Sequence, residues 1–412
     1  MIEYLGLVTT PIFFGKTYLM KSSFSSLGRV NDWLALRLSR VTSSGSLIPE
    51  VDGLRFLAIA AVVFHHLVSI YLPATGRVER IASSADWFAA AADSWLILAA
   101  YCGHFGVNLF FVISGFILAI PFVKRALLNQ PALPLRSYYL RRVTRIEPPY
   151  LICLIVYLLI KWHDGNDITG LLPSFAASSV YLHGPIFERE SAINGVAWSL
   201  EIEIQFYLIV PLLMRGFNMR DVRFRRYSLL GAIILFGLLS QLYIYPHGPK
   251  WLMISLPNFM HYFLAGFLLA DLYQVEGQRL RNRPWWGDLL AIGAAMAILW
   301  VLLGFGHLYF MLPILIAALY VGCYLGRIAN RLIRMEWIVI TGGMGYTIYL
   351  YHVMIISQAF VRTAQFSSTA RSFELDFLYQ CLLICPLILI ISAILFVTTE
   401  KPFMKLSLGR RA

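Results

Sequence analysis

The sequence repeats apolar segments of roughly membrane-spanning length along most of its 412 residues. A helix needs about 20 such residues to cross about 30 Å of hydrocarbon. Ten segments are identified at about residues 53–72, 105–123, 149–162, 196–214, 228–245, 255–274, 287–304, 308–326, 340–360 and 378–398. Because hydrocarbon offers the backbone no hydrogen-bond partner, we expect an all-α fold, a polytopic membrane bundle of about ten transmembrane helices. The stretch 168–183 could add a re-entrant piece.

Composition and charge placement support this reading. Hydrophobic residues make up 59% of the chain and charged residues 14%, and the mean hydropathy is +0.69. The net charge of +12 would suggest a nucleic-acid partner in a soluble protein, but the position of the cations decides otherwise. Segment 73–104 holds two Lys or Arg residues and segment 124–148 holds six. This asymmetry predicts that both termini are cytoplasmic. We therefore expect membrane lipids, and no nucleic acid, as partners.

The expected organisation is simple. Residues 1–50 form a cytoplasmic N-terminal extension with a possible amphipathic helix at 30–38, residues 51–403 form the membrane domain, and residues 404–412 form a cytoplasmic tail. We expect no soluble domain after Phe403. The five cysteines lie mostly in apolar segments and lack metal-ligand spacing, so no metal site is predicted.

Ionisable residues inside the apolar segments are the main functional signal, because such groups are costly in hydrocarbon and tend to mark function. The helical rise places four of them in one layer, about 10 Å below the outer surface. They are His66, Glu203, His261 and His352. We therefore expect a proton-handling site near the outer side of the membrane. His352 could equally be a hydrogen-bonded structural residue.

A basic helix before the third segment carries Arg141, Arg142 and Arg145, and Arg55 lies at the same cytoplasmic level. Guanidinium groups at helical spacing fit a polyphosphate, although a positive-inside anchor explains them equally well. In the second segment, Asn108 and the pair Ser114-Gly115 are polar or small. For Ser114 and Gly115 we favour helix packing.

These motifs resemble, in order, the acyltransferase type 3 family of integral-membrane O-acyltransferases over about residues 50–403. The resemblance is carried by Asp52-Gly53-Leu54-Arg55 with His66, by Phe110-Phe111-Val112-Ile113-Ser114-Gly115-Phe116, by Tyr139-Leu140-Arg141-Arg142-Val143-Thr144-Arg145 with Pro148, by Trp198-Ser199-Leu200 with Glu203-Ile204-Gln205-Phe206-Tyr207, by Tyr346 to His352, and by Glu400-Lys401-Pro402-Phe403.

The sequence departs from the family pattern at several positions. His65 precedes the motif His66, and spacing alone leaves open which of the two faces the site. Asn108 stands where the family often has Asp. Glu147 and Pro149 modify the usual end of the basic motif. Glu201 fills a position that is often small or polar, and we expect it to be solvated or paired.

The resemblance implies transfer of an acyl group, most simply acetyl, from cytoplasmic acyl-CoA to a hydroxyl of a cell-surface glycan, lipid-linked sugar or similar acceptor. The location implied is a bacterial-type inner (plasma) membrane. We expect His66 to act as general base with support from Glu203. His352 is a second catalytic candidate. Phosphates of acetyl-CoA are expected at Arg55, Arg142 and Arg145, with Arg141 beside them.

The sugar pocket is expected to be lined by aromatic rings and polar neighbours, although packing is an alternative for each aromatic. The candidates are Trp198, Tyr207, Tyr349, Asn108, His261 and Ser114. We favour direct transfer over an acyl-enzyme on Ser114 or Ser199. The alternative function is a proton-coupled transporter or flippase of a sugar, lipid-linked intermediate or acid, in which the buried ionisable residues relay protons.

Overall fold

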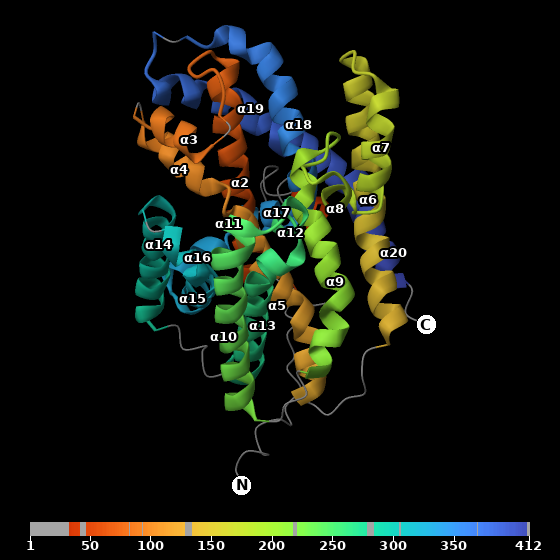
Figure 1. Cartoon of the computed structure of the whole chain (residues 1–412), viewed down its shortest axis with the longest axis vertical. Helices are drawn as coiled ribbons and strands as arrows, with labels where there is room; N and C mark the ends of the chain where they lie inside the picture. Colours follow the sequence, from red (N-terminus) through yellow and green to blue (C-terminus); the bar gives the residue numbers. More distant parts are fainter. Residues whose placement is uncertain are drawn as a thin grey trace.

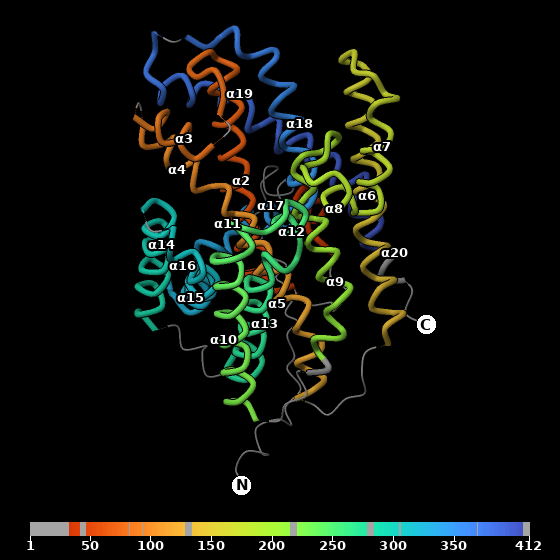
Figure 2. The backbone as a smooth tube through the Cα atoms, viewed as in Figure 1, coloured from red at the N-terminus to blue at the C-terminus, as the bar shows by residue number. Residues whose placement is uncertain are grey.

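The computed structural model describes residues 33–41, 47–81, 83–92, 94–127, 134–216, 221–277, 284–304, 306–368 and 370–409. All regular elements in these residues are helices (Figures 1 and 2). The longer ones are α2 (Pro49–Ala74), α5 (Gly106–Leu127), α6 (Leu135–His163), α9 (Trp198–Gly216), α10 (Val222–Leu239), α13 (Leu256–Glu276), α14 (Trp286–Gly304), α15 (Leu312–Leu325), α18 (Gly345–Thr363) and α19 (Phe373–Leu395).

Shorter helices connect or extend these. They are α3 (Ser84–Ala90), α4 (Trp95–Gly103), α7 (Ile168–Ser179), α8 (His183–Phe187), α11 (Tyr245–His247), α12 (Lys250–Met253), α16 (Ile328–Ile333), α17 (Glu336–Gly343) and α20 (Lys401–Gly409). Residues 33–38 are also helical, inside the amphipathic segment expected at 30–38.

The prediction of a polytopic helix bundle is confirmed. Among the described residues, nine helical segments are long and apolar enough to span a membrane, and α17 with α18 makes a tenth if that bent pair is one span. The helix axis bends by 73° between α17 and α18. These segments coincide with the ten expected from the sequence. The stretch 168–183 forms α7 and the start of α8 and is not among the candidate spans.

Large apolar side chains cover the outside of the bundle. Leu208 and Leu212 of α9, Leu235 of α10, and Leu382 and Ile390 of α19 are all exposed. A soluble protein rarely exposes contiguous apolar surface on this scale. Such a surface suits helices whose surroundings are lipid chains, because lipid chains solvate these side chains and do not solvate polar ones.

The centre of the bundle is built where small residues let helices approach closely. A Cβ atom at Gly342 of α17 would overlap the backbone oxygen of Asp52 in α2. A Cβ at Gly115 of α5 would likewise overlap the backbone oxygen of Phe263 in α13. The packing role that we favoured for Gly115 is therefore what this structure shows. These close approaches hold α17 against α2 and α5 against α13.

The two ends of α2 differ in chemistry. Near its start lie Arg40, Arg55, Arg142 and Arg145, and we call this the basic end. The other end, which we call the loop end, continues into residues 75–81 and lies beside residues 366–368. Figure 1 shows α3, α7 and the tops of α18 and α19 gathered toward that end. The placement of the basic end and both termini in the cytoplasm stays a prediction.

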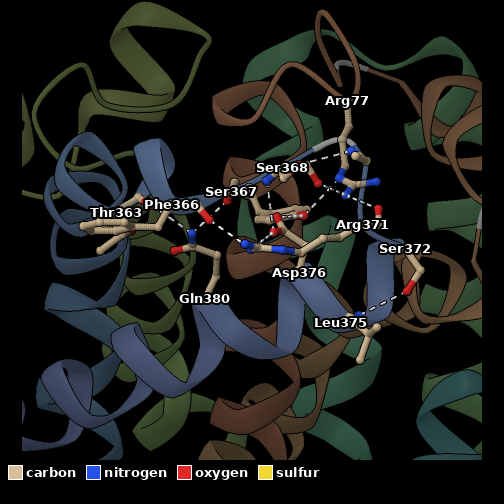
Figure 3. Close-up of polar contacts among 12 residues, drawn as sticks. Arg77, Thr363, Phe366, Ser367, Ser368, Arg371, Ser372, Leu375, Asp376 and Gln380 are labelled. Atoms are coloured by element: carbon tan, nitrogen blue, oxygen red, sulfur yellow. Dashed lines mark hydrogen bonds and ion pairs between the residues drawn. The ribbon is translucent and has the colours of Figure 1, made fainter.

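A polar network holds the loop end of α2 to α19 (Figure 3). The carboxylate of Asp376 is fully buried and accepts hydrogen bonds from the Tyr71 hydroxyl at 2.8 Å and from the Ser368 amide at 3.1 Å. It also pairs with Arg371 at 3.0 Å. Arg77 donates hydrogen bonds to the Tyr71 hydroxyl and to the backbone oxygens of Ser368 and Arg371. Ser368 and Arg371 are thereby fixed against the end of α2.

Candidate active site

His66 of α2 and His352 of α18 are in direct contact. His352 Nε2 lies 3.2 Å from His66 Nδ1, and the ring centroids are 4.9 Å apart. The two helices run side by side from the Gly342 approach onward, which brings residues 286 positions apart together. Two ionisable residues that the sequence placed at the same depth therefore share one site.

Backbone carbonyls assign the tautomers of these rings, because a carbonyl oxygen only accepts hydrogen bonds. His352 Nδ1 lies 3.0 Å and 2.8 Å from the oxygens of Ile348 and Tyr349, so it carries the proton and its Nε2 is an acceptor. His66 Nδ1 lies 2.9 Å from the Val62 oxygen, so its proton is shared between that oxygen and His352. In neutral His66 the Nε2 atom then holds a lone pair.

A small pocket with a volume of about 60 Å³, partly open to the outside, lies against His66. No hydrogen bond from a described residue reaches His66 Nε2, which leaves this atom available to a ligand. Besides two valines of α2 and α5, the lining consists of His66, Glu190, Gly195, Val196, Trp198 and Tyr349. The pocket thus combines a basic nitrogen, a carboxylate and two aromatic rings, a set that suits a polar, ring-shaped ligand.

Tyr349 is held rigidly in this lining. Its hydroxyl donates to the backbone oxygen of Val196. Since that donation uses its only proton, the Ser199 hydroxyl donates to Tyr349, with the two oxygens 2.8 Å apart. Trp198 packs its ring against Phe111 and Phe259. The sequence candidates Trp198 and Tyr349 are therefore both at the pocket, in fixed orientations.

Glu203 belongs to a different cluster from the one that we expected. Its carboxylate accepts hydrogen bonds from the Tyr207 hydroxyl and from Ser114 Oγ, the latter at 2.5 Å. The Arg142 guanidinium stacks over the Tyr207 ring, 5.5 Å from its centroid. No hydrogen bond joins Glu203 to His66 in the described part of the chain, so the pairing expected from the sequence is replaced by the contact with His352. Spacing along one helix could not reveal this, because it does not say which neighbour each side chain meets.

At the basic end, Asp52 pairs with two arginines. Its Oδ1 lies 2.9 Å from Arg40 Nη1 and 2.6 Å from Arg55 Nη1, and its side chain is 2% exposed. Arg55 itself keeps 16% of its side chain exposed. Arg40, in the segment before the first span, was not recognised from the sequence. Nothing in its local pattern marks it, because its partner lies on another element.

The basic end carries an excess of positive charge. Arg145 lies close enough to act electrostatically on Asp52 and Glu400, and Glu400 accepts a hydrogen bond from Thr347 at 2.5 Å. Four guanidinium groups, those of the basic end, therefore lie near the two carboxylates of Asp52 and Glu400. The excess suits the phosphates of an anionic donor.

Arg141 differs from its neighbours in placement. Its side chain is exposed and its Nε donates to the Ser137 backbone oxygen of its own helix. Arg142 instead lies over the rings of Tyr138 and Tyr207. The structure thus separates Arg141 from the inward-facing arginines with which the sequence grouped it.

The remaining candidates lie away from the pocket lining. His65 turns toward α3 and α4, where it stacks on Trp87 at 4.9 Å and its Nδ1 lies 3.0 Å from the Ala100 oxygen. Of the two adjacent histidines, His66 is therefore the one at the pocket. His261 is buried against Tyr262, and Asn108 is buried in α5. Neither lines the pocket.

Glu201 and Glu190 were also not assigned to the site from the sequence. Glu201 is 2% exposed and accepts a hydrogen bond at 2.8 Å from the amide of Gly184, so it has the pairing role that we expected. Glu190 lies in the loop between α8 and α9 and lines the pocket. A charged loop residue is ordinary in a sequence, and only the fold distinguishes Glu190 from its neighbours.

The comparison with protein families agrees with this geometry. A family described as an acyltransferase domain matches residues 48–397. The chain belongs to this acyltransferase family. The match covers most of the region in which the sequence resemblance was found and includes both histidines, Arg55, Arg142 and Arg145. The family expectation from the sequence is confirmed.

Named relatives are O-acetyltransferases. The chain is 28% identical over 212 residues to the peptidoglycan O-acetyltransferase OatA of Listeria monocytogenes. This alignment covers 49% of this chain and 29% of that protein. It is 25% identical over 214 residues to a Bacillus subtilis protein provisionally named as a peptidoglycan O-acetyltransferase, over 49% of this chain and 29% of that protein. A Staphylococcus aureus protein provisionally named as an O-acetyltransferase is 27% identical over 180 residues, or 40% of this chain and 24% of that protein.

The chain thus aligns with less than a third of the length of each of these relatives. No solved structure is significantly similar to it. Among the described residues, no group of three or more His, Cys, Asp or Glu side chains could hold a metal ion. The absence of a metal from the chemistry stays a prediction.

Proposed function

We propose that this acyltransferase family member is a membrane O-acyltransferase that moves an acyl group, most simply acetyl, from acyl-CoA to a hydroxyl of a glycan or lipid-linked sugar. The observation that carries the proposal is His66, which lines the pocket and whose Nε2 is left with a lone pair while its Nδ1 is held by Val62 and His352. That is the arrangement of an oriented general base.

In the proposed reaction, His66 Nε2 removes the proton of the acceptor hydroxyl as its oxygen attacks the thioester carbonyl. A carbon–oxygen bond forms, the carbon–sulfur bond breaks, and the proton passes to the departing thiolate. The contact with His352 holds the His66 ring in the required tautomer. A base of this kind contributes roughly 10²- to 10⁴-fold to the rate.

Direct transfer fits the contacts better than an acyl-enzyme. Ser114 donates its hydroxyl proton to Glu203, and Ser199 donates to Tyr349. Neither serine has a hydrogen bond to a histidine in the part of the chain that the structure describes. A serine nucleophile requires such a base within hydrogen-bond reach. We therefore propose that the acceptor hydroxyl itself is the nucleophile.

On the donor side, we propose that Arg55, Arg142 and Arg145 bind the phosphates of CoA at the basic end, which we place at the cytoplasmic face of an inner (plasma) membrane. Arg55 and His66 are separated by eleven positions of α2, or roughly 16 Å. An elongated donor bound at the basic end could span such a distance to present its thioester at the pocket.

The test is acyl transfer by membranes containing the full chain, supplied with radiolabelled acetyl-CoA and a peptidoglycan-derived oligosaccharide. His66→Ala should lower labelled product at least about 100-fold, at an unchanged protein level in the membrane. His65→Gln, which changes the neighbouring imidazole, is the matched control and should retain most activity. Near-normal product from His66→Ala would exclude the base role.

A cell-based measurement tests the function itself. Mass spectrometry of surface glycans and lipids from cells with and without this protein should reveal a lost acetyl mass on one component. Identical glycans and lipids, together with no transfer by the membranes, would contradict the proposed function. Movement of an unmodified sugar across the membrane would instead favour the transporter alternative.

A further inference from the structure

One carboxylate lines the pocket and has no partner among the residues that the structure describes. Glu190 lines the same pocket as His66, Trp198 and Tyr349 and is accessible from outside. A Cβ atom placed on Gly195 would lie 3.5 Å from Glu190 Oε2, so the carboxylate lies across the glycine at the start of the turn that leads into α9. No described residue hydrogen-bonds or ion-pairs with this carboxylate.

The loop that carries Glu190 is fixed on both sides. Ser191 Oγ lies 2.7 Å from Ser178 Oγ and accepts a hydrogen bond from a loop amide at 3.1 Å. Asn194, fully buried, donates to the Leu350 oxygen at 3.1 Å. Glu190 is thus a solvent-accessible acceptor, free of described protein partners, next to anchored loop positions. Its orientation toward the pocket is set by the fold.

The chemistry of the lining restricts the ligand. An ionised carboxylate only accepts hydrogen bonds, and neutral His66 offers an acceptor at Nε2. A ligand that satisfies both must therefore bring two donors, while the rings of Trp198 and Tyr349 supply apolar walls. A sugar ring has this character, because it carries neighbouring hydroxyls around faces of C–H groups. An alcohol with one hydroxyl does not.

We propose that Glu190 binds a second hydroxyl of the acceptor, next to the one acylated at His66, so that the enzyme requires a polyhydroxylated ring and selects against alcohols with a single hydroxyl. This inference rests on the proposed function. Glu190 is here a binding residue, and its contribution is to the capture and orientation of the acceptor. The hydroxyl that it holds keeps the neighbouring one beside His66.

Protonation of Glu190 gives a second readout. Burial by the surrounding protein raises the pKa of this carboxyl. The titratable groups that line the pocket with it are His66 of α2 and Tyr349 of α18, and Arg189 and Glu188 lie within two residues of it on its own loop. Because the ionised form is the better acceptor, the KM for the acceptor should fall as pH rises through this raised pKa.

The experiment uses the full chain in membranes with radiolabelled acetyl-CoA and two kinds of acceptor probe. One is a panel of methyl hexosides and methyl N-acetylhexosaminides, and the other is cyclohexylmethanol, whose single hydroxyl is on a methylene group attached to a ring of similar size. Glu190→Ala should raise the KM for the sugars roughly 10- to 100-fold, with kcat changed much less. Its low activity toward cyclohexylmethanol should match that of the wild type.

Two further variants complete the test. Glu190→Gln keeps an acceptor oxygen without the charge, so it should raise the sugar KM less than Glu190→Ala and remove the pH dependence of that KM. Glu188→Gln removes a carboxylate from the same loop outside the pocket lining and should behave as wild type. An unchanged sugar KM in Glu190→Ala, or equal losses with both probes, would overturn the inference.

The failure of the proposed function gives a distinct result. In that case the wild type would transfer label neither to these probes nor to isolated glycans, and the inference would fall with it. A wild type that acetylates cyclohexylmethanol as well as the sugars would instead leave the acyltransferase function intact and refute only the role of Glu190.

Discussion

His352 Nε2 accepts a hydrogen bond from His66 Nδ1 across 3.2 Å, and this contact orients the imidazole at the pocket. Its effect depends on the backbone, because the Ile348 and Tyr349 oxygens fix the proton of His352 on Nδ1. Two neutral rings are thereby placed in series, and His66, the one that lines the pocket, keeps an Nε2 lone pair without a partner among the described residues. His352 is a positioning residue in this arrangement.

Removing this support should slow the reaction without weakening substrate binding. His352→Ala is expected to lower kcat about tenfold, which corresponds to a lost hydrogen bond of about 1.4 kcal/mol, and to leave the acceptor KM nearly unchanged. His352→Gln keeps a side-chain oxygen acceptor and should recover part of the rate. A rise in KM with normal kcat would show that His352 contacts the substrate instead.

Glu203 is expected to act mainly on stability. Glu203→Ala leaves the hydroxyl donors of Ser114 and Tyr207 without their acceptor and should lower the free energy of unfolding by about 1–3 kcal/mol. Glu203→Gln keeps an acceptor oxygen and should cost less. Thermal unfolding in detergent measures both. Lost transfer with unchanged unfolding would place Glu203 in the catalytic step, as the sequence suggested.

Arg55 should matter for the donor. Arg55→Ala is expected to raise the KM for acetyl-CoA roughly tenfold or more, because a charge-assisted hydrogen bond to phosphate is lost while Arg40 still neutralises Asp52. Arg136→Ala removes the same charge from an exposed position at the start of α6 and is the matched control. Equal donor kinetics in the two variants would exclude Arg55 from the donor site.

The hydrogen-bond network around Asp376 should contribute to the stability of the fold and not to the acyl-transfer reaction. Asp376→Ala removes the acceptor of Tyr71, Ser368 and Arg371 and should lower the free energy of unfolding by about 2–3 kcal/mol. Arg371→Ala removes one half-exposed donor and should cost less than about 1 kcal/mol. Activity per folded molecule should stay near the wild-type value. A selective loss of activity would connect this loop to substrate entry.

The helices were predictable because their signal is local. A run of about 20 apolar residues has few ways to satisfy its backbone hydrogen bonds in hydrocarbon, so the ten segments could be located without tertiary information. The bend near Met344 was not predicted. Depth was predictable for the same reason, since it follows from counting residues along a helix. His66 and His352, placed at one level by this count, are in contact.

Rotation about each helix axis was not predictable, because one residue changes the direction of a side chain by about 100°. Depth therefore placed Glu203 at the level of His66, but packing turned it toward Ser114 and Tyr207. The same uncertainty left His65 and His66 undecided until Trp87 was found stacked on His65.

The sequence by itself determined the all-α bundle, its apolar segments and the family, because each depends on local composition and spacing. Only the tertiary structure decided which side chains meet, namely His352 with His66, Arg40 with Asp52, and Glu190 with the pocket. The physical reason is that these contacts join elements far apart in the chain. Their geometry is set by how the helices pack and not by any pattern within one of them.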